Sequence, residues 1–244
     1  MKKEEIISRL NPKFFKGICH RGYWNEEFTE NGLKAFENAL NHDMPLELDI
    51  HLTTDGELVV CHDENLIRTT GKEGIIEHMS SKEIRENYRL KDGGVVPTLK
   101  EVFDLINEKV PMVIELKVFE KNYKPLAAKL KEFLSSNVKD KKNFMLISFD
   151  PRSLWPLKKE GYVRSLLVAK SHEYVYNLFG RTIETYDLEK VLFEEKRIQK
   201  LVKKTLVNAW TIEGEDQIDK ILPYVDTVTF QHMDNELVTQ KLKK

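Results

Sequence analysis

The chain has few cysteines and no excess of either charge. Only Cys19 and Cys61 occur in 244 residues, too few for the disulfide framework of a small secreted domain and consistent with a reducing compartment. The 39 basic and 40 acidic side chains leave a formal net charge of −1. A surface that binds nucleic-acid phosphates needs clustered basic residues. We therefore expect no nucleic-acid partner.

Long apolar runs are also missing. No segment approaches the roughly 20 apolar residues that a membrane span requires. Near the start of the chain, Glu4, Glu5 and Arg9 interrupt the apolar stretch that a signal peptide would need. We expect a soluble, cytoplasmic protein without stable membrane association, and the sequence leaves both a monomer and a dimer open.

Short apolar segments alternate with longer amphipathic ones, a pattern typical of a parallel sheet covered by helices. Seven segments are predicted strands: residues 17–20, 46–52, 112–117, 144–149, 164–169, 206–210 and 226–230. An eighth strand is expected within residues 182–193, where the periodicity is blurred. Eight strand–helix units in about 250 residues is the size of a TIM (β/α)8 barrel. A doubly wound open sheet is the competing α/β fold, but no glycine-rich phosphate loop follows an early strand.

We interpret residues 1–244 as a single domain. Residues 66–96 carry four glycines and one short helical pattern, and we expect them to form a small loop-rich insertion after the hairpin of the second strand. Pro97 and Thr98 then precede a helical pattern, as is common at a helix start.

Ionisable side chains are concentrated in LELDIHLTTDGELVVCHD, from Leu46 to Asp63. In a strand, side chains two residues apart share a face. Glu47 and Asp49 therefore point to the side opposite their aliphatic neighbours, which in a barrel is the lumen. His51 shares this face, and we interpret it as a neighbour of the pocket.

The second half of this stretch predicts a reversal of the chain. Asp55-Gly56 between two strand-like runs is a strong hairpin signal. The hairpin returns His62 towards the level of the two acids. We expect Asp63, which follows it, to orient its neighbours.

Two further strands end in polar groups. Glu115 and Lys117 share a face of the strand at 112–117, and the first strand ends at His20-Arg21-Gly22. Catalytic groups of TIM barrels lie at the carboxyl ends of the strands, so all of these side chains can converge.

The residue types indicate a chemistry. Three carboxylates offer hard oxygen ligands for Ca²⁺ or Mg²⁺, and two histidines can act as general acid and base. An arginine and a lysine can neutralise a phosphate. Together they predict metal-assisted cleavage of a phosphoester.

Four segments resemble the glycerophosphodiester phosphodiesterases: CHRGYWNEEFTENGLKAFENAL, LELDIHLTTDGELVVCHDENLIRTTG, VPTLKEVFDLI and VIELK. The combination of motifs is specific, although each alone is weak. The resemblance implies a TIM barrel with one divalent cation, Ca²⁺ or Mg²⁺. The residues that match the family's metal ligands are Glu47, Asp49 and Glu115.

The resemblance also assigns roles to the remaining polar residues. It implies that His20 and His62 are the acid–base pair and that Arg21 and Lys117 contact the substrate phosphate. Glu30 and Asn31 match a family motif at the start of the first helix, where Glu30 approaches the metal or orders His20. Trp210 matches an aromatic residue of the pocket wall.

The implied reaction converts a glycerophosphodiester and water into sn-glycerol 3-phosphate and an alcohol. The nucleophile is either water or a glycerol hydroxyl, which would give a cyclic phosphate intermediate. One alternative is a lysophospholipase D-like phosphodiesterase with the same metal and histidines and an apolar groove for an acyl chain. Another is a catalytically silent barrel that binds metal or phosphodiester.

Overall fold

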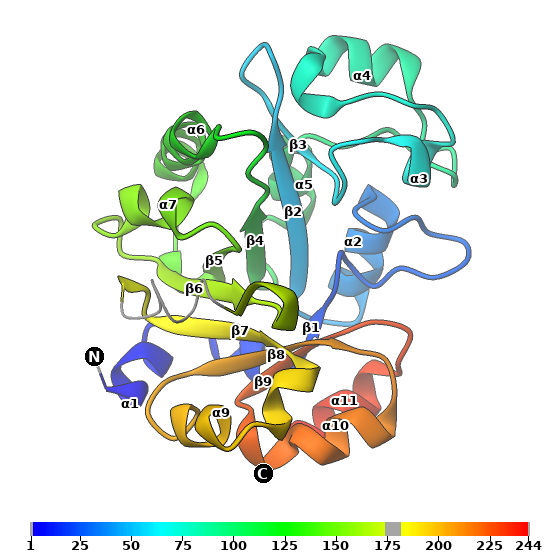
Figure 1. Ribbon diagram of the computed structural model, residues 1–244. Coiled ribbons are helices and arrows are strands. Elements are labelled where there is room, and N and C mark those ends of the chain that lie inside the picture. The colour runs from blue at the N-terminus through cyan, green and yellow to red at the C-terminus, as the bar shows by residue number, and fades with distance from the viewer. Residues whose placement is uncertain (1, 174–181, 244) are drawn as a thin grey trace.

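The computed structural model describes residues 2–173 and 182–243 (Figure 1). Within these residues eight parallel strands form a closed barrel. They are β1 (Ile18–Cys19), β2 (Leu46–Leu52), β4 (Met112–Leu116), β5 (Phe144–Ser148), β6 (Val163–Val168), β7 (Thr185–Glu189), β8 (Val207–Ile212) and β9 (Thr227–Phe230). The barrel closes because Cys19 of β1 pairs with Leu46 of β2 on one side and with Phe230 of β9 on the other. The expected TIM barrel is confirmed, and β7 is the eighth strand.

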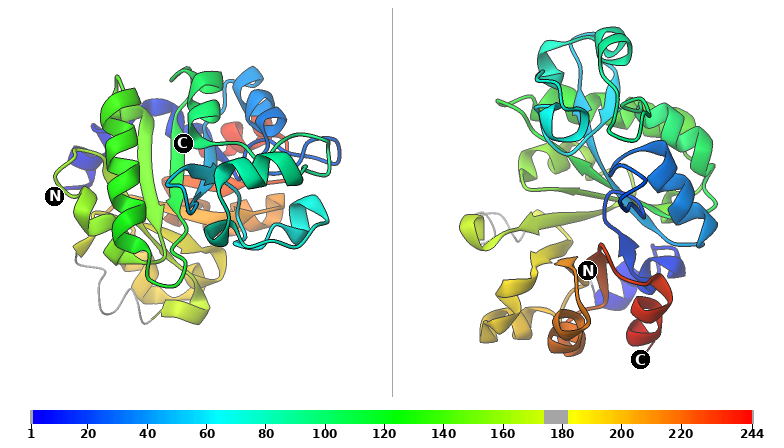
Figure 2. Two further views of the ribbon diagram at one scale, coloured as in Figure 1. Left: turned by 90° about the horizontal axis from the view of Figure 1, so that it is seen from above. Right: turned by 90° about the vertical axis from the view of Figure 1, so that its right-hand side faces the viewer.

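Helices surround the barrel in both views of Figure 2. They are α1 (Lys3–Ile7), α2 (Leu33–Asn41), α5 (Leu99–Ile106), α6 (Tyr123–Asn137), α7 (Pro151–Leu154), α9 (Lys196–Leu201), α10 (Glu215–Ile221) and α11 (Asn235–Leu242). Short 3-10 helices connect them: η1 (Pro12–Lys16), η3 (Lys141–Asn143), η4 (Trp155–Leu157), η5 (Lys170–His172), η7 (Lys190–Glu194) and η8 (Leu222–Tyr224). Thr98 caps α5 as predicted, since its hydroxyl accepts a hydrogen bond from the Glu101 amide at 3.2 Å. None of the helices in the described part of the chain has the length and apolar character that a membrane crossing demands.

The core has two separate apolar layers. Leu46, Leu48 and Ile50 point outward from β2 and are buried between the strands and the helices. A second cluster, which includes Phe14 of η1 and Val113 of β4, fills the amino-terminal end of the lumen. This cluster closes the amino-terminal end, so water and substrate can enter the lumen from the carboxyl end of the barrel.

The Asp55-Gly56 turn makes the predicted hairpin. Strand β3 (Leu58–Val60) runs antiparallel to β2, with Val60 opposite Ile50. The Cys61 amide donates to the Asp49 carbonyl at 3.1 Å, which fixes the chain just before His62 beside the centre of β2.

Residues 66–96 form α3 (Ile67–Thr70), η2 (Ile76–His78) and α4 (Ser81–Asn87). These elements lie together at one side of the barrel, beyond the β2–β3 hairpin (Figure 1). They enclose a small apolar cluster of their own, whose buried members include Leu66, Ile76, Ile84 and Tyr88.

Candidate active site

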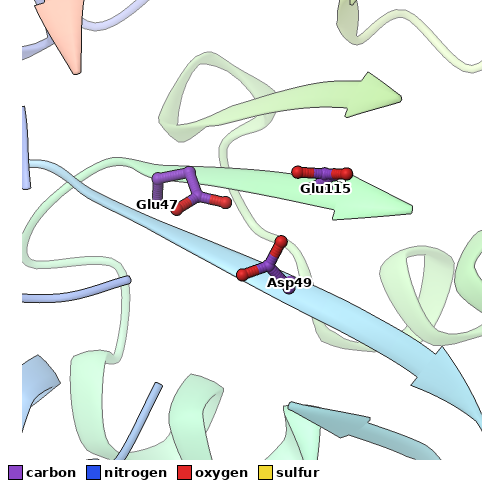
Figure 3. Close-up of side chains that lie close together, drawn as sticks. All are labelled: Glu47, Asp49 and Glu115. Atoms are coloured by element: carbon purple, nitrogen blue, oxygen red, sulfur yellow. The ribbon is translucent and has the colours of Figure 1, made fainter. Parts of the chain in front are cut away.

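Three buried carboxylates meet at the centre of the barrel mouth. Glu47 and Asp49 extend from β2, and Glu115 extends from the adjacent strand β4, where it is the pairing partner of Asp49 (Figure 3). One oxygen from each carboxylate lies within 4.8 Å of the others, and the three residues are 1 to 7% exposed. The alternation of side chains along β2 and the pairing of β2 with β4 thus bring together the three residues expected to bind metal.

The three carboxyl groups have different proton affinities. Burial and the neighbouring charges of Asp49 and Glu115 raise the pKa of Glu47 well above its usual value. Burial likewise raises the pKa of Glu115 to about 7. Burial opposes ionisation of Asp49 too, but Lys117, His62 and Arg21 outweigh it and lower the pKa of Asp49.

These residues fit a divalent cation. Asp49 Oδ1 is buried and accepts no hydrogen bond from the described residues; the Lys117 ammonium is 3.6 Å away. Clustered buried carboxylates repel one another unless a positive charge lies between them. Three carboxylates supply the oxygen ligands that Ca²⁺ and Mg²⁺ prefer.

The two side chains expected to contact phosphate border this cluster. Lys117 Nζ lies 3.0 Å from a Glu115 oxygen, and Arg21 Nε lies 3.6 Å from Asp49 Oδ2. Arg21 Nε is buried and makes no hydrogen bond to the described residues. Both cations therefore face the acids from positions where an anionic substrate could also contact them.

The His20-Arg21-Gly22 turn positions Arg21. Arg21 and Gly22 both have left-handed backbone conformations, with φ of 57° and 81°. This geometry directs the Arg21 amide to Glu47 Oε2 at 2.9 Å. Gly22 packs so closely on α2 that a Cβ there would lie 2.9 Å from the Ala35 carbonyl carbon.

We expect Gly22→Ala to lower the free energy of unfolding by at least about 2 kcal/mol, since a left-handed alanine alone costs roughly 1 to 2 kcal/mol and the contact with Ala35 adds to it. Gly56→Ala is the matched control, because Gly56 has the same φ of 81° but a Cβ there would meet no atom of residues 2–173 or 182–243 within 4 Å. Urea unfolding of both variants measures the difference. Equal losses of stability would show that the close approach to α2 is unimportant.

The two histidines line one cavity of about 110 Å³ together with Arg21, Glu47 and Glu115. Burial, aided by the adjacent Arg21, lowers the pKa of His20 to about 4. Burial also lowers the pKa of His62, although the charge of Asp49 opposes the effect. Both imidazoles are therefore neutral near pH 7 and able to accept a proton.

Hydrogen bonds determine which ring nitrogen is the base. Gln231 Nε2 donates to Glu213, so its Oε1 faces His20 Nδ1 at 2.7 Å. His62 Nδ1 lies 2.6 Å from an oxygen of the Asp63 carboxylate. Acceptors at both Nδ1 atoms favour the Nδ1–H tautomer, which leaves Nε2 of each ring to exchange protons.

The residues expected around the pocket have defined contacts. Asn31 Nδ2 donates to Asp49 Oδ2 at 2.8 Å. The Glu30 carboxylate accepts hydrogen bonds from Arg21 and Arg68, rather than from His20. Trp210 lines the cavity with its indole edge-to-face on Phe149.

His51 has both ring nitrogens engaged. Nδ1 lies 2.5 Å from Glu77 of η2 and Nε2 lies 3.2 Å from the His62 carbonyl. It lines a larger cleft of about 670 Å³, which shares Glu115, Phe149 and Leu167 with the smaller cavity. These contacts suit a residue that supports the pocket.

Sequence patterns missed several polar residues near the site. Gln231, which follows the adjacent strand β9, contacts His20. Arg68 contacts Asp63, five residues before it in the chain. Asp187 also lines the smaller cavity, and burial raises its pKa. A polar residue on the lumen face of β7 was the one available signal for Asp187, and the blurred periodicity of residues 182–193 obscured it.

The comparisons with known proteins agree with this geometry. A sequence model of the glycerophosphoryl diester phosphodiesterase family matches residues 20–234. The chain belongs to this family. All of the site residues described above lie within the matched range.

Relatives of known sequence match part of the chain. A glycerophosphodiester phosphodiesterase of Caldanaerobacter subterraneus is 36% identical over 155 residues, which are 58% of this chain and 61% of the relative. A human lysophospholipase D is 35% identical over 131 residues, which are 48% of this chain and 38% of the relative. The matches thus span less than two thirds of either relative's length.

A solved structure matches nearly the whole chain. The glycerophosphodiester phosphodiesterase of Thermotoga maritima superimposes with a TM-score of 0.73 at 26% identity, covering 93% of this chain and 96% of that one. The barrel and its connections are therefore shared over almost the full length.

Proposed function

We propose that this protein hydrolyses glycerophosphodiesters to sn-glycerol 3-phosphate and an alcohol, with one divalent cation as cofactor. The observation that carries the proposal is one cavity lined by both neutral histidines, Arg21, Glu47 and Glu115. Asp49 completes the carboxylate cluster beside it, and Lys117 contacts Glu115 and Asp49. Membership in the family supports the same reaction.

The side chains divide the work of binding. Glu47, Asp49 and Glu115 would hold the cation, which supplies Lewis-acid polarisation of the phosphoester. Arg21 and Lys117 neutralise the phosphodiester anion, the first with a planar fork and the second as a point charge. The substrate is thereby oriented with its phosphorus near both histidines.

The histidines move the protons. Nε2 of one histidine removes a proton from the nucleophile, which is water or a glycerol hydroxyl, and the other histidine protonates the departing alkoxide. Burial keeps both rings neutral in the free protein, and the negative charge of a bound phosphodiester favours protonation of the ring that acts as the acid. Attack by water gives the products directly, whereas attack by the glycerol hydroxyl gives a cyclic phosphate first, which ³¹P NMR of the reaction would detect.

The decisive experiment measures sn-glycerol 3-phosphate release from glycerophosphocholine, glycerophosphoethanolamine and glycerophosphoinositol, with Ca²⁺ or Mg²⁺ and with EDTA. We expect turnover that requires one of the cations. Binding of these compounds without any turnover would instead support a silent barrel, and turnover unaffected by EDTA would contradict the role of the cation.

Lysophospholipase D-like activity is the second candidate. The human relative supports it, and so does the larger cleft beside the site, whose lining includes Phe119, Phe149, Pro151 and Leu167. Choline release from lysophosphatidylcholine and from glycerophosphocholine compares the two substrates in one assay. A preference for the lysophospholipid would make this the principal activity.

The cysteines bear on the cellular location of the protein. Both cysteines are unpaired and buried, as suits a reducing compartment, and we propose that the protein is cytoplasmic.

Cation binding is expected to weaken below about pH 7. The pKa of Glu115 is raised to about 7, so at lower pH the cation must displace a proton. Affinity then falls by up to about tenfold per pH unit for each proton displaced. Calorimetric titration with Ca²⁺ and Mg²⁺ at pH 5.5 and pH 8 tests this, and equal affinities at the two pH values would contradict it.

A further inference from the structure

Arg68 of α3 connects two carboxylates at the rim of the barrel. Its Nε donates to Asp63 Oδ2 at 2.5 Å. Its two terminal nitrogens donate to the two oxygens of Glu30, at 2.7 and 2.8 Å. Arg68 belongs to the RTTG segment that follows the hairpin, and it has no role in the proposed proton transfer or cation binding.

Each of these carboxylates holds a residue of the active site. Asp63 Oδ1 is 2.6 Å from His62 Nδ1. Glu30 Oε1 accepts from Arg21 Nη1 at 2.8 Å. A continuous path of charged hydrogen bonds therefore runs from His62 through Asp63, Arg68 and Glu30 to Arg21.

The charges along this path support one another. Burial opposes ionisation of Asp63 and Glu30, but the hydrogen bonds from Arg68 outweigh it and lower the pKa of both carboxyls. The Glu30 side chain is only 8% exposed and lies between two guanidinium groups. Its carboxylate can satisfy both arginines because each oxygen accepts from Arg68 and one also accepts from Arg21.

The insertion has other anchors, so its folding does not explain this contact. Leu66 and Thr69 are buried, and the Leu66 amide donates to the Gly74 carbonyl at 2.9 Å. The Arg68 side chain is 44% exposed. It contributes little apolar burial and makes specific polar contacts towards the site.

We propose that Arg68 is a positioning residue, which holds the acid–base residue His62 and the phosphate-binding residue Arg21 in a fixed relative orientation through Asp63 and Glu30. The inference rests on the proposed phosphodiesterase function. It assigns a role to the insertion, which supplies the group that couples proton transfer to phosphate binding. Arginine is required because its planar fork can bond two carboxylates at once, whereas the lysine ammonium is a single point charge.

The main test compares steady-state kinetics of Arg68→Ala and wild type on glycerophosphocholine. Loss of a group that orients a site residue commonly costs about 10- to 100-fold. We expect a fall of this size in kcat, because His62 loses its orientation, together with a rise in KM, because Arg21 does. Arg68→Lys is expected to recover less than half of the loss in kcat/KM.

Guanidinium rescue separates positioning from folding. The exposure of Arg68 leaves a small cation access to the gap in Arg68→Ala, so guanidinium chloride at a non-denaturing concentration should raise kcat/KM several-fold, while ammonium chloride at the same concentration should not. Arg85→Ala is the matched control: Arg85 also lies in residues 66–96 and pairs with the Glu101 carboxylate at 2.7 Å. It should show wild-type kinetics.

The tautomer of the His62 ring can be measured without any assay of activity. In wild type, ¹⁵N chemical shifts of the His62 ring should show one predominant tautomer, with the proton on Nδ1; in Arg68→Ala the two tautomers should be mixed. Unchanged tautomers together with unchanged kinetics in Arg68→Ala would overturn the inference, as would a loss of activity that follows thermal stability and resists guanidinium. A wild-type protein inactive on every glycerophosphodiester would overturn the proposed function alone, and the tautomer measurement would still decide the role of Arg68 as a positioning residue.

Discussion

Replacing either His20 or His62 by alanine is expected to lower turnover of glycerophosphocholine by roughly 10²- to 10⁴-fold, the usual contribution of a general acid or base. Both rings line the same cavity as Glu47 and Glu115. Both are neutral at pH 7, because burial lowers their pKa values. Each substitution removes one proton carrier and leaves the carboxylate cluster intact.

The measurement combines kcat with cation binding. We expect the two variants to bind Ca²⁺ or Mg²⁺ like wild type while turnover is lost. His42→Ala is the control, since His42 is exposed and lies at the carboxyl end of α2. Its Nδ1 is 2.8 Å from the Asn38 carbonyl of the same helix, away from the site. Near wild-type turnover in either His20→Ala or His62→Ala would exclude that histidine from proton transfer.

Backbone geometry made the centre of the site predictable. Side chains alternate across any strand, so the pattern of β2 alone determines that Leu46 and Leu48 face the helices while Glu47 and Asp49 face the lumen. The Asp55-Gly56 signal likewise determined the hairpin that brings His62 back. These are short-range rules, and they hold whatever the rest of the chain does.

Contacts between distant segments could not be predicted in this way. Gln231 reaches His20 only because β1 and β9 become neighbours when the barrel closes. Glu30 and Arg68 meet because residues 66–96 fold back towards the loop before α2. Such pairs depend on tertiary packing, and the sequence around each residue carries no information about its partner.

The blurred pattern of the eighth strand has a physical cause. Within β7, Tyr186 and Leu188 are buried in the outer apolar layer, as expected for a barrel strand. Asp187 between them faces the lumen, where Asn208 of β8 donates a hydrogen bond to it. A strand that supplies a polar residue to the lumen and is followed by the charged segment η7 loses the apolar signal on which strand prediction relies.

Glu47→Gln is expected to abolish cation binding and to lower turnover by at least about 100-fold. Substituting a residue that only supports a metal ligand typically costs about 10- to 100-fold in activity, and the loss of a ligand should exceed that. In the absence of cation the same variant should be more stable than wild type at pH 8. Burial and the charges of Asp49 and Glu115 raise the pKa of Glu47, so the ionised side chain destabilises the folded state. A glutamine carries no charge, and its carbonyl oxygen can still accept the hydrogen bond from the Arg21 amide.

The sign of the pH dependence follows from the direction of this shift. A carboxyl with a raised pKa binds a proton more tightly in the folded state than in the unfolded state, so its contribution to stability is lost as pH rises from the ordinary glutamate value through the raised one. The advantage of Glu47→Gln over wild type should therefore grow from pH 4.5 to pH 8. Thermal unfolding at several pH values, with EDTA and with Ca²⁺ or Mg²⁺, measures both effects.

Asp187→Asn is the matched control for the cation. Asp187 is also a buried carboxylate that lines the cavity and has a raised pKa, but it lies outside the group of three oxygens within 4.8 Å of one another. We expect the cation to raise the unfolding temperature of Asp187→Asn and wild type alike and to leave that of Glu47→Gln unchanged. A cation-induced rise in Glu47→Gln would remove Glu47 from the ligand set, whereas lower stability without cation at pH 8 would show that its charge is already compensated by Arg21. The expected pair of results, a more stable protein that no longer binds cation, would mean that the fold tolerates a repulsive cluster because the cation requires it.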